Sequence, residues 1–230
     1  MGAGARYTAL VSSLPHLVPP FAARERPLSR AALDRRLGWL GPADARTLAD
    51  IEALLRPAPK KADEALTAEA RRLVAAIAPP DLREAVRRRL EQRTLIAALR
   101  RRHNGEGPPP AAALGYHRAQ RHIRGHWTAP GFGLPNRSGW LTAVETALRD
   151  GPPVALERLM IQRAWRDLAR LGAGHWFDFT AVAFYVLRWD MVDRWLRAEA
   201  AGARKRFDHL VAAALDTAER PPSLQQPDLQ

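Results

Sequence analysis

The sequence has no cysteine, only three lysines and no long hydrophobic run. Without cysteine, a disulfide scaffold and thiolate metal sites are excluded. The longest nearly apolar run is residues 179–187, which is less than half of the roughly twenty residues that a membrane-spanning helix needs. No secretory signal pattern is visible near the start of the chain. We therefore expect a cytoplasmic protein that reaches a membrane only through partners.

Motifs that mark common enzyme classes are also missing. We find no phosphate loop, no glycine-rich dinucleotide fingerprint and no strand–turn–helix motif around a nucleophilic serine. We therefore expect a protein that is not an enzyme, with no cofactor, no bound metal and no small-molecule substrate.

The chain is rich in arginine. It has 230 residues, of which 47% are apolar and 26% charged, a composition typical of globular proteins. Its formal net charge is +12, and all but three of the 36 basic residues are arginine. A surface of this kind attracts anionic partners, which include nucleic acid, anionic lipid and an acidic protein face.

Apolar residues recur at three- and four-residue spacing through most of the chain, which predicts an all-α fold of many helices. The segment before Pro15 is compatible with a short strand or a first helical turn. The segment 104–110, rich in glycine and proline, predicts a linker between an N-terminal helical lobe (1–103) and a C-terminal helical lobe (111–220), with a flexible tail at 221–230. Helices are expected at about 29–40, 42–55, 67–78, 80–103, 111–127, 138–150, 154–171, 176–199 and 203–218, with Ser29 and Thr67 as N-caps.

The helix expected at 81–103 carries most of the clustered arginines. Leu82, Val86, Leu90 and Ala97 form one apolar stripe. Arginines line its border and end, at Arg89, Arg93, Arg100, Arg101 and Arg102. They can be solvated residues whose stems shield the stripe, or a surface that binds an acidic partner. Nucleic-acid binding is a third interpretation, but the helix has no aromatic residue on which bases could stack.

Three histidines fall on the helix expected at 111–127. His122 and His126 have the i, i+4 spacing of zinc-binding helices, and His117 precedes them. No glutamate base accompanies them, so a metal-dependent enzyme is the alternative that their spacing leaves open. His175 and Asp178 form another acid–base pair, again without a recognisable nucleophile.

The segment 175–195 is the most aromatic part of the chain. Its apolar residues form two stripes, which predicts a helix packed between neighbours, with Trp189 in the core. An aromatic interface is the alternative. Two i, i+4 pairs, Asp190 with Arg194 and Asp193 with Arg197, are expected to stabilise this helix.

The segments 7–15 and 177–195 resemble an uncharacterised bacterial family encoded in V-type ATPase operons. The residues that carry the resemblance are Tyr7, Pro15, Phe177, Asp178, Phe179, Arg188, Trp189, Asp190 and Trp195. Residues 95–102 are similar to a helix that recurs in one central-stalk component of these rotary enzymes. That component sits on the membrane rotor ring and receives the foot of the central shaft.

The resemblance implies a non-catalytic component or assembly partner of a V-type ATPase, similar in fold and role to that central-stalk component. Such a protein would lie on the cytoplasmic face of the inner membrane and couple the central shaft to the rotor ring during ion transport. The partners it implies are these ATPase subunits, and the five arginines of residues 89–102 are the candidate partner-binding residues. A basic helical nucleic-acid-binding protein is the alternative.

Overall fold

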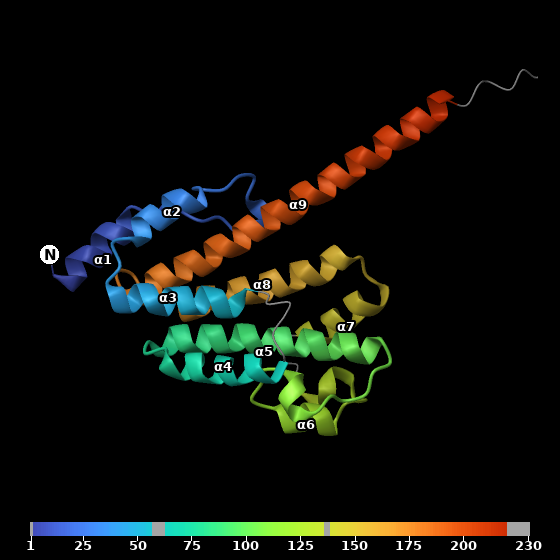
Figure 1. Cartoon of the computed structure of the whole chain (residues 1–230), viewed down its shortest axis with the longest axis horizontal. Coiled ribbons are helices and arrows are strands. Elements are labelled where there is room, and N and C mark those ends of the chain that lie inside the picture. Colours follow the sequence, from blue (N-terminus) through green and yellow to red (C-terminus); the bar gives the residue numbers. More distant parts are fainter. Residues whose placement is uncertain (1, 57–62, 136–138, 220–230) are drawn as a thin grey trace, which may run out of the picture.

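The structure, a computed structural model, describes residues 2–56, 63–135 and 139–219 (Figure 1). Within these ranges it contains α-helices, three short 3-10 helices and no strand, so the all-α prediction is confirmed. The elements are α1 (Ala3–Ser12), η1 (Pro20–Ala22), α2 (Arg30–Leu37), α3 (Pro42–Leu55), α4 (Asp63–Ala76), α5 (Pro80–His103), η2 (Ala111–Leu114), α6 (Gln120–Gly125), η3 (Pro130–Gly133), α7 (Trp140–Asp150), α8 (Pro153–Leu171) and α9 (Phe179–Glu219).

Several helix starts follow from local signals in the sequence. The Ser29 hydroxyl accepts a hydrogen bond from the backbone N–H of Ala32, at 3.2 Å, and caps α2 as expected. Pro42 and Pro80 occupy the first turns of α3 and α5, where a missing N–H costs nothing. The bounds expected for these two helices match the structure.

Other expected elements are wrong. The segment before Pro15 is neither a strand nor a single turn but the helix α1. Thr67 caps nothing, because α4 begins at Asp63 and Thr67 is buried within it. The helix expected at 111–127 is interrupted at Gly115, whose φ of 94° is incompatible with a right-handed helix, and only η2 and α6 remain of it.

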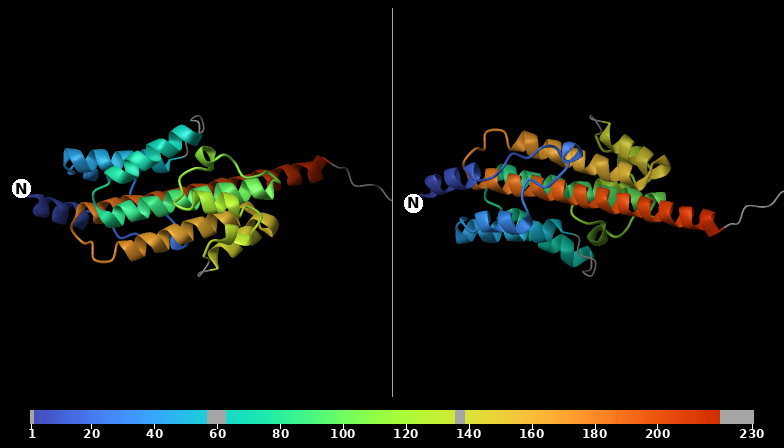
Figure 2. Two further views of the ribbon diagram at one scale, coloured as in Figure 1. Left: turned by 90° about the horizontal axis from the view of Figure 1, so that it is seen from below. Right: turned by 90° about the horizontal axis from the view of Figure 1, so that it is seen from above.

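The last two expected helices are one. Helix α9 continues through Gly202, and its 41 residues extend about 60 Å at 1.5 Å per residue. Its first half lies in the protein body, whereas its second half projects beyond every other element (Figures 1 and 2). Phe207 on the projecting part is 66% exposed. None of the helices in the described ranges is long and apolar enough to span a membrane.

Helix α5 lies in the middle of the body and joins two apolar clusters. The larger cluster combines its N-terminal half with α1 to α4, α8 and α9, and extends from Leu10 to Trp195. The smaller one packs its C-terminal half, including Ile96 and Leu99, against α6, η3, α7 and α8. Because the larger core draws on residues from both sides of the 104–110 segment, the two-lobe arrangement is not confirmed. The expected tail, 221–230, lies outside the described residues.

Candidate functional site

Two of the five candidate arginines point into the protein. Arg93 donates from Nη1 to the carbonyl oxygens of Leu54 and Leu55, at 3.2 and 3.3 Å. Arg89 donates to Gln92 Oε1 at 3.2 Å. Burial, reinforced by the charges of Arg194 and Arg93, lowers the pKa of Arg89 to about 10. The apolar stripe expected on this helix also ends early, since Ala97 is exposed and Ile96 and Leu99 are buried instead.

The remaining three arginines lie in different surroundings. Arg102 bonds the carbonyl oxygens of Trp127 and Ala129, at 3.2 and 2.7 Å, and pairs with Glu145. Arg101 is half-buried with Glu106 4.0 Å away, and Arg100 is exposed. The five arginines therefore do not form one exposed surface. Arg100 and Arg101 are the members of the set that a partner can still reach.

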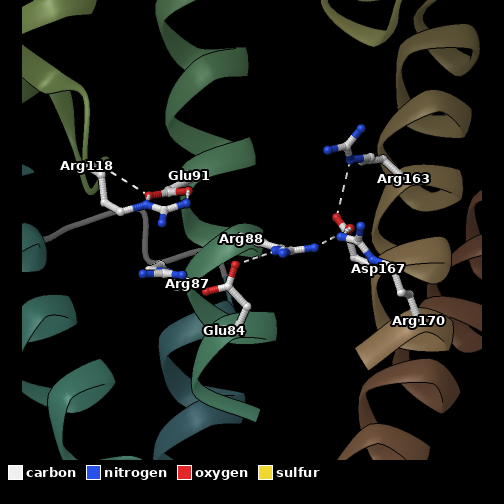
Figure 3. A network of polar contacts seen from close by, with 8 residues as sticks. All are labelled: Glu84, Arg87, Arg88, Glu91, Arg118, Arg163, Asp167 and Arg170. Atoms are coloured by element: carbon white, nitrogen blue, oxygen red, sulfur yellow. Dashed lines mark hydrogen bonds and ion pairs between the residues drawn. The ribbon is translucent and has the colours of Figure 1, made fainter. Parts of the chain in front are cut away.

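A different set of arginines gathers where α5 faces α8 (Figure 3). Asp167 on α8 is in contact with three guanidinium groups: Arg88 of α5 at 3.1 Å, and Arg163 and Arg170 of its own helix at 3.3 and 3.2 Å. The last two are one turn of α8 away on either side, as i, i+3 and i, i+4 spacing requires. One carboxylate thus holds three positive charges together.

The α5 side of the same network has two carboxylates. Glu84 pairs with Arg87 and, at 2.5 Å, with Arg88. Glu91, which is buried, accepts from Arg118 Nε at 2.7 Å and from the Arg118 backbone N–H at 3.2 Å. These bonds attach the segment between η2 and α6 to α5.

The eight residues in Figure 3 line or flank a surface cleft of about 310 Å³, the α5–α8 cleft. Five guanidinium groups face three carboxylates, so the network retains an excess of positive charge. The side chains of Arg118 and Arg170 are 58% and 66% exposed and can turn toward a partner. The cleft is therefore suited to bind carboxylates or phosphates by charge-assisted hydrogen bonds.

The three histidines of the interrupted helix do not form a metal site. His122 and His126 stack with ring centroids 4.0 Å apart. His117 accepts from the backbone N–H of Ala119 at 2.9 Å, and burial lowers its pKa. In the described ranges no group of three His, Asp or Glu side chains is placed to hold a metal ion.

His175 links two helix starts. Its Nδ1 lies 2.6 Å from Asp178, and its Nε2 lies 3.1 Å from Asp81 at the start of α5. The hydrogen bond to Asp178, followed by that to Asp81, raises the pKa of His175. Asp178 also accepts from the backbone N–H of Ala181 at 2.8 Å and so caps α9. These contacts fix the start of α9 and involve no nucleophile.

The residues that carry the family resemblance divide into three groups by surroundings. Phe179, Trp189 and Trp195 are buried, so the expected core position of Trp189 is confirmed. Tyr7 bonds Asp44 and Arg188 donates to the carbonyl oxygen of Leu168 at 2.8 Å, while Pro15 is half-buried. Phe177 and Asp190 are exposed.

Comparisons with protein-family models, with curated proteins and with solved structures find no match for this chain.

Proposed function

We propose that this protein is a non-catalytic component or assembly partner of a bacterial V-type rotary ATPase, which binds an acidic surface on one of the other ATPase subunits through the α5–α8 cleft. The observation that carries the proposal is the excess of arginine over carboxylate in that cleft. An acidic protein face would neutralise it and would accept bidentate hydrogen bonds from the guanidinium groups. The identity of the partner rests on the resemblance of residues 7–15 and 177–195.

The shape of the molecule supports a coupling role. The start of α9 is held in the body by the core around Trp189, while its second half extends far beyond the body (Figure 2). At the opposite end, the segment before α9 presents Trp176, which is 73% exposed, beside the exposed Phe177. Exposed aromatic residues are enriched at protein–protein contacts. The protein can thus contact different subunits at its two ends, as a link between the central shaft and the rotor ring requires.

The proposal is tested by isolating the tagged chain from gently solubilised membranes and identifying what accompanies it. We expect rotary ATPase subunits, released as salt is raised because exposed charge pairs are screened. Recovery without any other ATPase protein would contradict the proposal. Salt-dependent binding to random duplex DNA in place of assembly would support the nucleic-acid alternative.

A further inference from the structure

A cavity of about 450 Å³ opens between α3, α4, α5 and η2, on a different face of α5 from the cleft. Its volume lies within the range of protein sites that bind small molecules. The walls are largely aliphatic, and the leucines among the lining residues are Leu54, Leu66, Leu73, Leu90 and Leu114. An apolar molecule can therefore be held here away from water.

Arg93 lines this cavity. Its Nη1 donates to the backbone oxygens of Leu54 and Leu55, at the C-terminal end of α3. In the described part of the chain no carboxylate pairs with Arg93, and the charge that acts on it is the like charge of Arg194. A guanidinium group in a desolvated position without a counter-charge is costly. An anion in the cavity would offset this cost.

Other charged residues lie around the cavity. Arg56 and Arg72 are exposed, and Arg101 is half-buried. Asp50 and Glu69 also line it, and both Glu69 and Arg101 already interact within the chain. Arginines therefore outnumber acids around the cavity, which favours entry of an anion over a cation.

We propose that this cavity binds a medium-chain aliphatic carboxylate, with its carboxylate paired to the Arg93 guanidinium and its chain against the leucines. The fork of N–H donors on a guanidinium group matches a carboxylate. The aliphatic walls match an alkyl chain, since burying its methylene groups removes apolar surface from water. The site is separate from the α5–α8 cleft and does not depend on the proposed function.

Decanoate is the probe, and isothermal titration calorimetry on the full chain is the measurement. We expect saturable binding of decanoate below its micelle-forming concentration. Decanol, which has the same chain without the charge, should bind more weakly, and acetate, which has the charge without the chain, should not bind measurably. Failure of decanoate to bind would overturn the proposal.

Two variants locate the site. Arg93→Gln should weaken decanoate binding by about tenfold or more while leaving decanol binding unchanged, because only the charged contact is lost. Ala97→Phe should abolish binding of both, since Ala97 is an exposed residue in the cavity lining and a larger side chain there fills the space without disturbing the core. Arg100→Gln, an exposed arginine of the same helix, is the matched control and should bind like the parent.

Thermal unfolding of each variant separates loss of the site from loss of the fold. If Arg93→Gln is destabilised, Ala97→Phe still tests the cavity. Unchanged decanoate binding in Ala97→Phe would show that the fatty acid lies elsewhere and would overturn the proposal. Equal weakening of decanoate and decanol by Arg93→Gln would overturn the charge pairing.

Discussion

At the scale of single residues, surroundings decide what each arginine of α5 does. Arg89 and Arg100 both border the expected apolar stripe, yet Arg89 bonds Gln92 inside the protein and Arg100 is exposed. The difference arises because α3 and α8 cover the first part of α5 on that side. Helical periodicity gives a residue's direction from its own axis but not which neighbour covers it. Burial and hydrogen bonding therefore had to come from the structure.

Trp189→Ala should destabilise the protein strongly. The indole is 2% exposed and its Nε1 donates to the carbonyl oxygen of Leu28 at 3.0 Å. Removal of a large aromatic side chain from a packed core costs about 3–5 kcal/mol. Urea unfolding gives the free-energy difference directly. A loss below about 1 kcal/mol would contradict a core role for this residue.

His175→Gln should cost more stability at low pH than at high pH. Because the pKa of His175 is raised by Asp178 and Asp81, the protonated form is favoured in the folded state. Its contribution is complete below the unfolded pKa of about 6.5 and is lost as pH rises through the higher folded pKa. We expect a cost larger by about 1 kcal/mol at about pH 5.5 than at about pH 8.5.

The matched control for this prediction is His16→Gln. His16 is exposed and lies outside the helices. Urea unfolding of both variants at the two pH values is the measurement. An equal cost of His175→Gln at both values would show that the two carboxylates do not hold the imidazolium.

At the scale of elements, the turn at Gly115 decides how the chain passes from η2 to α6. Gly115 has a φ of 94°, and a Cβ there would lie 2.9 Å from Thr94 Oγ1. The same hydroxyl donates to the Tyr116 carbonyl oxygen at 2.9 Å. The turn is thus pressed against α5, and this close approach explains why a helix cannot continue through it.

Gly115→Ala should destabilise more than Gly105→Ala. Both glycines have positive φ, but nothing lies within 4 Å of a Cβ at Gly105. The left-handed conformation alone costs about 1–2 kcal/mol for alanine. Crowding against Thr94 should add about 1 kcal/mol or more. Thermal unfolding of both variants measures the difference, and equal losses would contradict the close contact between the turn and α5.

Much of the element pattern could be predicted from the sequence, and the site could not. Proline at the first turn set the bounds of α3 and α5, and the i, i+4 pair of Asp193 with Arg197 is present. Arg194, however, bonds Glu157 of α8 at 3.2 Å in place of its expected partner, because that pairing depends on how helices pack.

The α5–α8 cleft shows the same limit. Sequence inspection selected the arginines clustered in residues 89–102 and missed Arg118, Arg163, Asp167 and Arg170. The i, i+3 and i, i+4 spacing of the α8 residues was a local signal for their grouping around Asp167. Nothing local indicated that Arg88 and Arg118 would join them, since those contacts connect distant segments.

At the scale of the whole molecule, the charged cleft lies on a body from which α9 projects (Figures 1 and 3). The body is held by a core shared between α5, α8 and α9, so a load applied to the far part of α9 is passed to the helices that form the cleft. This arrangement suits a link between two partners. The proposed function makes the cleft the contact for one of them.

The measurement that tests the account most directly is binding of the Arg118→Gln/Arg170→Gln variant to the ATPase. We expect affinity to fall by about tenfold or more, equivalent to about 1.4 kcal/mol. The control is Arg35→Gln/Arg46→Gln, which removes the same charge from exposed positions on α2 and α3 and should change affinity by about twofold at most. Thermal unfolding checks that each variant is folded, since Arg118 also bonds Glu91. Equal affinity of the cleft variant and the parent would contradict the proposal that this cleft binds the partner.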